Sequence, residues 1–394
     1  MTEIMQEKSA TLAVVRKPCL LVMAGGTGGH IFPGLAVAEQ LHSQGWHIHW
    51  LGIAHKMEAE IVPKYGYDIS FIEISGIRNK GWLAKAFMPI KLVRSLYQAR
   101  KIIKKIEPDV ALGMGGYASA PGAIVAWALN IPVVLHEQNA AAGLTNRLLA
   151  RLATKVCCAF PNAFVGNIKA EVVGNPLRNN IGMVSAEKPV ENITQNILIV
   201  GGSLGAQILN QVVPQSYKQL VALYQDTSIY HQTGKGKYKD VIASYGPEQM
   251  ATKKIEVVEF INDMAAAYEW ADVVICRAGA LTVSELAMAG KASIFIPLPH
   301  AVDDHQTKNA QYLVSRGAAK LLPQAQLTPE SLTQVLVDLF TQKDLLKQMA
   351  NAARKAADTK ATVKVSAFCQ KLVDDKKTNI QGIASLMNNN EEIK

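Results

Sequence analysis

Cysteine is scarce in this sequence. Its 394 residues contain only five cysteines, and none of them forms a Cys-x-x-Cys pair. This usage excludes a small scaffold held by disulfides and is typical of free thiols in a reducing, cytosolic compartment. Residues 1–17 mix charged residues with short apolar stretches, without the apolar core of a signal peptide, so we expect a loose extension there.

Charge is missing from residues 110–135, a stretch long enough to be mistaken for a membrane span. Glycines and prolines interrupt it. We predict a strand, a glycine turn, a short helix opened by Pro121 and a second strand that begins near Pro132. A buried β–α–β unit, covered on both faces of its sheet, explains this stretch better than a transmembrane helix.

Acidic residues are missing from residues 78–105, which hold nine Lys or Arg and therefore account for the whole formal net charge of +9. From residue 89 onward the cations recur at spacings of three and four. An apolar stripe that includes Leu92, Leu96 and Ile103 does the same on another face. The pattern predicts a basic amphipathic helix.

The residues around the start of this helix combine apolar and basic side chains: Trp82, Leu83, Phe87, Met88, Lys91 and Arg94. That composition is expected at an anionic lipid surface, so we predict peripheral contact with a membrane. The alternative is an ordinary surface helix that packs its apolar stripe on the core. No recognition motif for nucleic acid accompanies the cations, so a nucleic-acid partner is not expected.

Strand-like and helix-like segments alternate along the chain, which predicts an α/β fold with doubly wound parallel sheets. The clearest strands form two series: 19–24, 47–52, 109–113 and 132–137, then 196–202, 254–260, 272–277 and 292–297. A polar stretch at residues 175–195 separates the series, and we place a hinge there. Two such halves leave a cleft between the carboxyl ends of their strands, where ligands bind in these folds.

Three glycine-rich loops each follow a predicted strand: GGTGGH (25–30), GMGGY (113–117) and GGSLGA (201–206). The first precedes a helix predicted over residues 34–43 and would expose backbone N–H groups to an anion or a bulky ligand. It is no P-loop, because no Lys-Ser/Thr pair follows, and Ile31 breaks the G-x-G-x-x-G spacing. Three loops in two halves favour a site for large phosphorylated substrates over simple tight turns.

The second half carries CRAGALTVSELAMAG (276–290), in which a strand turns at Gly279 into a helix that starts near Ala280. The amides at the start of that helix suit a diphosphate. Glu285 lies one turn further and could accept hydrogen bonds from a ribose diol. The alternative is that Glu285 is an ordinary solvated glutamate on the helix surface. The next predicted strand is followed by a polar run that includes Gln306.

Seven motifs occur in order: GGTGGH, GMGGY, HEQN, GNPLR, GGSLGA, CRAGALTVSE and DHQTKNA. Over about residues 17–367 they resemble the MurG family of bacterial glycosyltransferases. The resemblance implies a GT-B fold, that is, two Rossmann-like domains facing a cleft. It implies transfer of N-acetylglucosamine from UDP-N-acetylglucosamine to the C4 hydroxyl of undecaprenyl-diphospho-muramoyl-pentapeptide. The transfer is expected to be inverting and to need neither a metal nor a cofactor. Its role is expected in peptidoglycan synthesis, and so in cell wall formation, cell shape and cell division.

The resemblance also implies a division of the chain and a location. After the extension at 1–17, an acceptor and membrane-facing domain spans residues 18–177 and a UDP-sugar-binding domain spans residues 178–357. A helix at about 358–374 is expected to pack back on the first domain, ahead of a polar tail at 375–394. Members of the family work as peripheral proteins on the cytoplasmic face of the bacterial inner membrane.

Site residues are implied motif by motif. For UDP-N-acetylglucosamine they are Thr27, Gly28, Gly29, Asn139, Arg178, Ser203, Ile261, Ala280, Leu281, Thr282, Val283, Ser284, Glu285 and Gln306. For the acceptor side they are Gly115, Gly116 and Tyr117. Ile261 would hold the uracil through its backbone, and Arg178 and Ser203 would meet the diphosphate.

An inverting transfer needs a base for the acceptor hydroxyl, and His30 at a helix N-terminus is our first candidate. The positive end of the helix dipole disfavours imidazolium and keeps a neutral base available near pH 7. The alternative is that His30 only pins the glycine loop by hydrogen bonds. His136 and Glu137 remain rival candidates, either as the base or as groups that orient the acceptor.

No metal site is expected. His47 and His49 alternate on one strand face, but no Cys or carboxylate stands near them at ligand spacing, so we interpret them as ordinary strand residues. Two further functions compete with the lipid-linked transferase. One is another GT-B enzyme, such as a diacylglycerol glycosyltransferase or a UDP-sugar epimerase, and the other is a non-enzymatic module that binds membrane or nucleic acid through the basic helix.

Overall fold

The computed structural model describes residues 16–74, 88–178, 181–182, 184, 194–202, 204–299 and 304–391, with side chains described as far as 378. Our predictions for Trp82, Leu83, Phe87 and Ser203 therefore lie outside the described residues, as does the extension up to residue 15. Within the described chain, no helix is both long enough and apolar enough to cross a bilayer.

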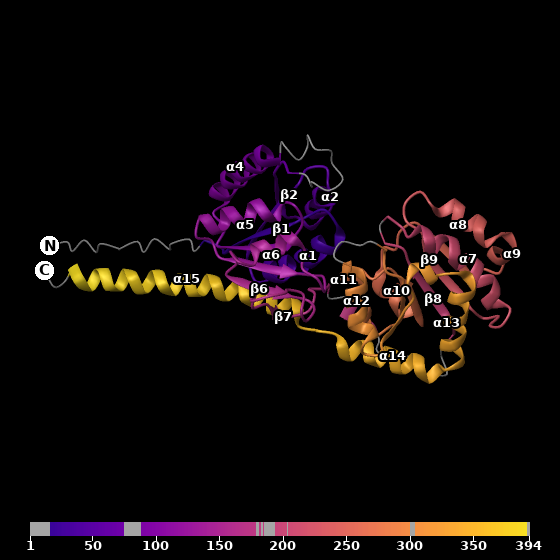
Figure 1. Cartoon of the computed structure of the whole chain (residues 1–394). Helices are drawn as coiled ribbons and strands as arrows, with labels where there is room; N and C mark the ends of the chain where they lie inside the picture. Colours follow the sequence, from indigo (N-terminus) through magenta and orange to yellow (C-terminus); the bar gives the residue numbers. More distant parts are fainter. Residues whose placement is uncertain are drawn as a thin grey trace, which may run out of the picture.

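Two parallel sheets organise the chain, as Figure 1 shows. The first has the order β3-β2-β1-β4-β5-β6-β7 and the second the order β10-β9-β8-β11-β12-β13. Every strand pair in both sheets is parallel. Both orders turn at the first strand of the sheet, which is the doubly wound arrangement. The predicted fold class of two Rossmann-like domains is confirmed.

The strands of the first sheet are β1 (Cys19–Ala24), β2 (His47–Gly52), β3 (Asp68–Phe71), β4 (Val110–Gly115), β5 (Val133–Glu137), β6 (Lys155–Cys158) and β7 (Glu171–Val172). Those of the second are β8 (Asn196–Val200), β9 (Ser228–Gln232), β10 (Ile255–Val258), β11 (Val273–Cys276), β12 (Ala292–Phe295) and β13 (Ala319–Leu321). All eight strands that the sequence predicted are present. The apolar stretch at 110–135 is the unit β4–α5–β5, as expected.

Helices cover both faces of each sheet. The first domain has α1 (Gly28–Ser43), α2 (Met57–Ile61), η1 (Val62–Tyr65), α4 (Met88–Ile106), α5 (Ser119–Ala128) and α6 (Leu144–Leu149). The second has α7 (Gln207–Val221), α8 (Tyr238–Tyr245), α9 (Pro247–Ala251), α10 (Met264–Trp270), α11 (Ala280–Ala289), α12 (His305–Val314), η5 (Gln324–Gln326), α13 (Pro329–Thr341) and α14 (Lys343–Ala356). Two buried clusters lie in each domain, so each sheet is buried on both faces.

Helix α1 begins at Gly28, six residues before the predicted start, so that prediction was wrong. The predicted start at Gly34 had left Pro33 just outside the helix, because proline is disfavoured in a helix interior. Instead Pro33 lies inside the helix. The helix reaches past it because Ile31 and Leu35 both enter the core of the first sheet, and this burial offsets the cost of the proline. As a result His30 belongs to the first turn of the helix.

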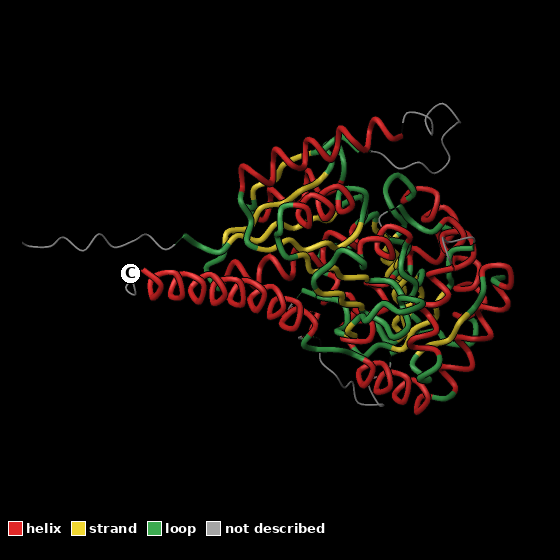
Figure 2. The backbone as a smooth tube through the Cα atoms, turned by 60° about the vertical axis from the view of Figure 1, so that its left-hand side comes forward, coloured by secondary structure: helices red, strands yellow, loops and turns green. Residues whose placement is uncertain are grey.

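The last helix, α15 (Ala361–Glu391), returns to the first domain. Its residues Val365, Cys369 and Val373 belong to the same buried cluster as α1 and β1. Figures 1 and 2 show the helix running along that domain and projecting beyond it. The stretch 375–391, expected as a polar tail, continues this helix.

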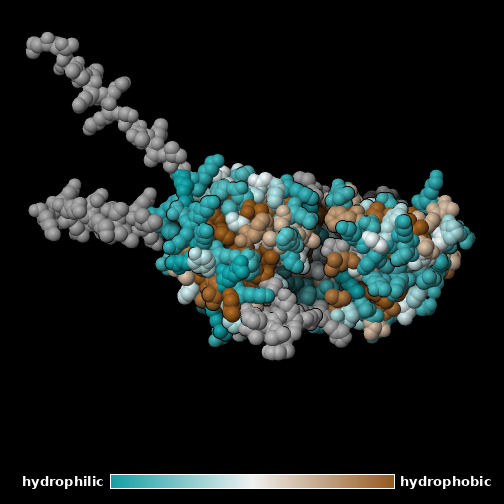
Figure 3. Space-filling view, turned by 90° about the horizontal axis from the view of Figure 1, so that it is seen from above, coloured by the Kyte–Doolittle hydropathy of each residue, from teal (hydrophilic) through white to brown (hydrophobic). Residues whose placement is uncertain are grey.

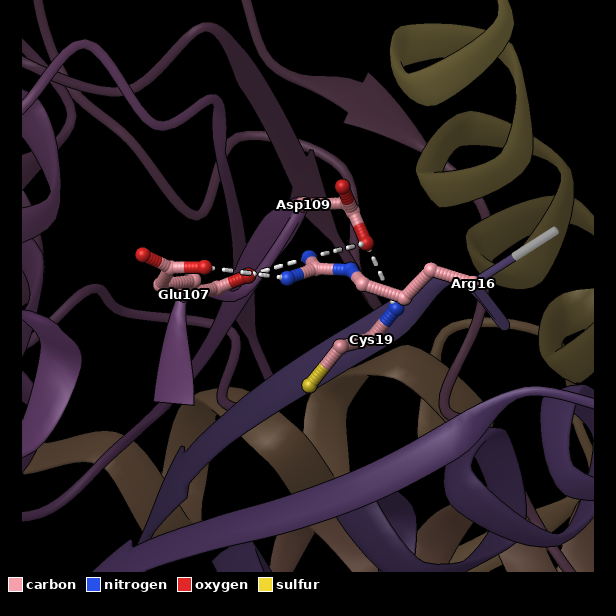
Figure 4. A network of polar contacts seen from close by, with 4 residues as sticks. All are labelled: Arg16, Cys19, Glu107 and Asp109. Carbon is pink, nitrogen blue, oxygen red and sulfur yellow. Dashed lines mark hydrogen bonds and ion pairs between the residues drawn. The ribbon is translucent and has the colours of Figure 1, made fainter. Parts of the chain in front are cut away.

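At the amino ends of the strands, Arg16 ties the start of the described chain to the segment that enters β4 (Figure 4). Its guanidinium lies 3.1 Å from Oδ2 of Asp109 and also pairs with Glu107. The same Asp109 oxygen accepts a hydrogen bond from the backbone of Cys19 at 2.8 Å. Arg16, which fell in the expected loose extension, is therefore held by its contacts with Asp109 and Glu107. All five cysteines are buried free thiols.

Candidate functional site

The glycine-rich loops of the first domain meet at the carboxyl edge of its sheet. The loop after β1 and the loop after β4 lie side by side, because Ala24 pairs with Gly115 at the end of the two strands. The second domain approaches this edge with α11 and α12. Asn309 Oδ1 accepts a hydrogen bond from the backbone of Ala140 at 2.7 Å, and Asn175 donates to Ser284 Oγ at 2.9 Å. Figure 3 shows the surface hollowed where the domains meet.

The loop after β1 is fixed by Glu58, a residue that the sequence analysis missed. Its fully buried carboxylate accepts hydrogen bonds from the backbone N–H groups of Gly26, at 3.0 Å, and Ile53, at 3.1 Å. A Cβ atom on Gly25 would lie 2.3 Å from Glu58 Oε1, so a larger residue there would displace this carboxylate. The available signal was the helical spacing that places Glu58 on the same side as Ile61 and Val62.

His30 faces the second glycine loop from the first turn of α1. Its Nδ1 lies 3.3 Å from Thr27 Oγ1, and a Cβ atom on Gly115, whose φ is +96°, would lie 2.9 Å from the imidazole Cδ2. Burial lowers the pKa of His30, whereas the charges of Glu137 and Glu58 raise it. The imidazole is thus held as a neutral group, which is the form a general base requires.

His136, the second candidate base, is fully buried and has both ring nitrogens occupied. Its Nε2 lies 2.9 Å from the carbonyl of Gly174 and its Nδ1 lies 3.2 Å from the side-chain nitrogen of Gln138. Burial lowers the pKa of His136 to about 4. The carbonyl oxygen of Gly174 can only accept a hydrogen bond, so His136 Nε2–H donates to it. The other ring nitrogen, Nδ1, then accepts a hydrogen bond from the side-chain amide of Gln138. This geometry suits a positioning residue beside the interdomain segment better than a base.

Glu137, the third candidate, is also buried and serves as an acceptor for four donors. Oε1 accepts from the backbone and side-chain nitrogens of Asn139, at 2.9 and 3.1 Å. Oε2 accepts from the backbone of Gly143 at 3.3 Å and from Asn146 Nδ2 at 2.8 Å. The carboxylate therefore holds the loop after β5 and fixes Asn139 at the edge that faces the second domain.

In the second domain, α11 presents its N-terminus at the end of β11. Gly279 is the extended N-cap residue, and the first intrahelical bond of the turn runs from Val283 N–H to its carbonyl. The amides of Ala280, Leu281 and Thr282 have no partner within the helix by its geometry. Ala280 and Val283 point their side chains into the core. For Ala280 and Val283, the backbone is therefore the part that a ligand can reach.

Glu285 lies one turn into α11, where Tyr268 OH donates to its Oε2 at 2.9 Å. Burial raises the pKa of Glu285, while the charge of Arg178 lowers it. Ile261 is 4% exposed. Its side chain belongs to the core of the second domain, so its backbone is the part available to a ligand.

Arg178 connects the two halves of the site. Its guanidinium stacks on the ring of Phe32 in α1, 4.0 Å from the centroid. The charge of Arg178 also lowers the pKa values of Glu39 in α1 and Glu285 in α11, although burial raises both. Arg178 therefore lies between α1 of the first domain and α11 of the second, whose N-terminus has the geometry that suits a phosphate.

The remaining predicted residues lie at the edges of the site. Gln306 is in the first turn of α12 and accepts a hydrogen bond from the backbone of Leu298 at 2.9 Å. Gly116 follows β4 beside the first loop, and Tyr117 next to it is exposed. Gln306 thus follows the end of β12, and Gly116 and Tyr117 follow the end of β4, as the sequence predicted.

Helix α4 has two apolar stripes, of which the sequence analysis recognised only one. Ala99 and Ile103 are buried and Leu92 packs against the core, as predicted. Ile90, Val93 and Tyr97 face solvent instead, with exposed fractions of 65–71%. Lys91 and Arg94 are exposed beside them, and Arg94 pairs with Glu73 at 3.0 Å. Figure 2 shows α4 along the outer side of its domain, and Figure 3 shows apolar side chains among hydrophilic ones on this domain.

Comparisons with known proteins cover both domains. The glycosyltransferase family 28 N-terminal domain matches residues 20–158 and the family 28 C-terminal domain matches residues 196–365. A relative in Colwellia psychrerythraea is 60% identical over 380 residues, which cover 95% of this chain and 96% of the relative. One in Aeromonas hydrophila is 53% identical, over 90% and 96%. Both are named UDP-N-acetylglucosamine–N-acetylmuramyl-(pentapeptide) pyrophosphoryl-undecaprenol N-acetylglucosamine transferase.

Among solved structures, Acinetobacter baumannii MurG has a TM-score of 0.76 and 41% identity, over 90% of this chain and 100% of that one. The UDP-GlcNAc 2-epimerase of Neisseria meningitidis has a TM-score of 0.62 over 90% and 100%, but only 13% identity. The likeness to the epimerase is therefore one of fold alone.

Proposed function

Because the chain belongs to glycosyltransferase family 28, we propose that it transfers N-acetylglucosamine from UDP-N-acetylglucosamine to the muramyl unit of N-acetylmuramyl-(pentapeptide) pyrophosphoryl-undecaprenol. The observation that carries the proposal is the 60% identity with a transferase of that name along nearly the whole of both chains. The activity places the protein in peptidoglycan synthesis.

His30 is the proposed general base. In the transfer, the acceptor C4 oxygen bonds to the anomeric carbon from the face opposite UDP. The bond from that carbon to the diphosphate breaks, and the hydroxyl proton passes to the imidazole. The support for His30 over its rivals is geometric: His30 is partly exposed beside the second glycine loop, whereas His136 and Glu137 are buried and held by hydrogen bonds to their own neighbours. A base of this kind contributes about 10²- to 10⁴-fold in rate.

The second domain stabilises the departing diphosphate. The unbonded amides at the start of α11 carry the positive end of the helix dipole, and Arg178 adds a full positive charge next to α11. Such donors are fixed before the reaction, so they need no reorganisation as charge develops. Glu285 receives the ribose hydroxyls, Ile261 holds the uracil through its backbone, and Asn139 and Gln306 contact the sugar.

The lipid-linked acceptor enters from the first domain, at Gly115, Gly116 and Tyr117. Helix α4 contacts the membrane there as a peripheral surface, on the cytoplasmic face of the inner membrane. The support is the exposed apolar stripe of Ile90, Val93 and Tyr97, with basic residues on either side. Apolar side chains enter the interfacial region while cations meet anionic headgroups.

The deciding experiment measures UDP release by the purified chain given UDP-N-acetylglucosamine, with and without a short-chain analogue of the lipid-linked muramyl pentapeptide. Acceptor-dependent release is the expected result. Donor binding without such release would contradict the proposed acceptor. A diacylglycerol transferase would then be tested by supplying diacylglycerol as the acceptor, and an epimerase by looking for an epimerised UDP-sugar in the absence of any acceptor.

A further inference from the structure

Two histidines and an aspartate converge at the amino ends of β2 and β3, away from the carboxyl ends that carry the candidate site. They are His47 and His49 of β2 and Asp68 of β3, and each offers one ligand atom, all within 4.8 Å of one another. β3 is the edge strand of the first sheet. His47 and Asp68 are exposed and His49 is half-buried, so the cluster is open to solvent.

The strand register explains why the three side chains meet. His47 and His49 are two residues apart and lie on the same face of β2, and His49 is the direct partner of Asp68 in the parallel ladder. His47 Nε2 lies 3.8 Å from Asp68 Oδ2. The sequence analysis had rejected a metal because it found no carboxylate at ligand spacing. The carboxylate comes from the neighbouring strand, which linear spacing does not reveal.

The neighbouring strand β3 fixes the orientation of the His49 ring. His49 Nε2 lies 2.9 Å from Ser70 Oγ, the next side chain of β3 on this face. A hydrogen bond from one ring nitrogen to such a partner orients the imidazole and leaves the other nitrogen free to coordinate.

We propose that His47, His49 and Asp68 bind a divalent transition metal ion of the zinc type, with water completing the coordination. Two imidazoles and one carboxylate suit Zn²⁺, whereas Mg²⁺ and Ca²⁺ prefer oxygen ligands. Coordination at about 2.0–2.1 Å requires the three ligand atoms to move closer together than they are now. His47 can do so by side-chain rotation, since half of its side chain is exposed.

A metal at this position would clip the edge strand β3 to β2. It would stabilise the folded first domain, because the three ligands come together only when the sheet forms. It would take no part in the transfer, since the glycine loops and α11 lie at the other ends of the strands. The proposal is therefore independent of the proposed enzyme activity, and either can fail without the other.

The test is calorimetric titration of Zn²⁺, and separately of Mg²⁺, into untagged full-length protein that has been treated with a chelator. We expect one zinc site and a Tm that rises by at least about 2 °C with excess zinc. His47→Gln and Asp68→Asn change exposed side chains, and each should weaken zinc binding by at least tenfold. Glu60→Gln, an exposed carboxylate on α2, is the matched control and should bind zinc like the unchanged protein.

Absence of zinc binding would overturn the proposal. It would equally be overturned by zinc binding that both variants leave unchanged, or by Mg²⁺ that binds as tightly as Zn²⁺. Circular dichroism spectra of each variant verify that it is folded. The rate of UDP release, measured with and without chelator, should stay the same, which separates this site from the transferase centre.

Discussion

The two domains form their halves of the site with different chemical groups. In the first domain, buried carboxylates hold the loops: Glu58 fixes the loop after β1, and Glu137 fixes the loop after β5. In the second domain, the start of α11 supplies backbone amides, and the carboxylate one turn further, Glu285, accepts from Tyr268 and holds no loop among the described contacts. In the proposed mechanism, the first domain supplies the one fixed side chain that proton transfer needs, and the second domain supplies the several fixed dipoles that charge stabilisation needs.

The largest effect is expected from His30→Ala. Turnover should fall by at least about 10²-fold, because the acceptor hydroxyl loses its base. Affinity for UDP-N-acetylglucosamine should remain nearly unchanged, since the proposed nucleotide site lies in the second domain. Steady-state kinetics and donor titration measure the two quantities separately. Unchanged turnover would exclude His30 as the base.

Loss of the buried carboxylate in Glu58→Gln should lower kcat about tenfold with little change in donor KM. A glutamine cannot accept from both Gly26 and Ile53 without turning its own amide donor toward one of these N–H groups, and an unsatisfied buried donor costs about 1–3 kcal/mol. Glu60→Gln, on the same helix but exposed, is the control. If thermal stability falls but kcat stays constant, Glu58 stabilises the fold and does not position the loop after β1 for catalysis.

The second domain is tested by Arg178→Lys. Lysine keeps the charge but loses the planar guanidinium that stacks on Phe32. We expect donor affinity to weaken about tenfold, which corresponds to about 1.4 kcal/mol, with a smaller change in kcat. Arg316→Lys, which also removes a guanidinium stacked on a ring, is the control. A large fall in kcat at constant donor affinity would contradict the division of roles between the domains.

The dependence of kcat/KM on pH should report His30. The neutral imidazole is the active form, and burial lowers its pKa from the ordinary value of 6.5, so activity should persist below pH 6.5 and fall only as the pH passes the lowered pKa. Because the charge of Glu58 raises this pKa, Glu58→Gln should move the acidic limb to still lower pH. An acidic limb above pH 6.5 would exclude His30 as the titrating group.

The smallest effect is expected at the outer face of α4. Val93→Ser or Tyr97→Ser should weaken sedimentation with anionic vesicles about three- to tenfold, because each removes apolar area from the interface. The rate with a short, soluble acceptor analogue should not change. Val363→Ser on α15 is the control, since Val363 is also exposed. Equal binding by all these variants would exclude the stripe from membrane contact.

The sequence predicted the strands and both sheets because buried parallel strands form apolar runs that end at glycines. It also located the first and second glycine loops and α11. It failed at the start of α1, where burial of Ile31 and Leu35 outweighs local proline preference. The sequence motifs could not rank His30, His136 and Glu137, because the ranking depends on hydrogen bonds with residues such as Gly174 and Asn146.

Glu58 and Asp68 were missed for related reasons. Glu58 interacts with a loop more than thirty positions away, and Asp68 meets His47 and His49 only through strand pairing. Both residues interact with polar groups that are distant in the sequence, and the local periodicity of a sequence gives little information about such interactions. Motifs thus located the chemistry, whereas the residues that hold it in position required the three-dimensional arrangement.

The return of α15 to the first domain has a consequence for the order of folding during synthesis. The first domain cannot complete its core until Val365, Cys369 and Val373 have left the ribosome, although its last strand ends at Val172. At about 5–20 residues per second, translation of the second domain occupies roughly 10–40 s. During that interval the apolar surface that Val365, Cys369 and Val373 later cover stays exposed to other chains, while the second domain can already fold.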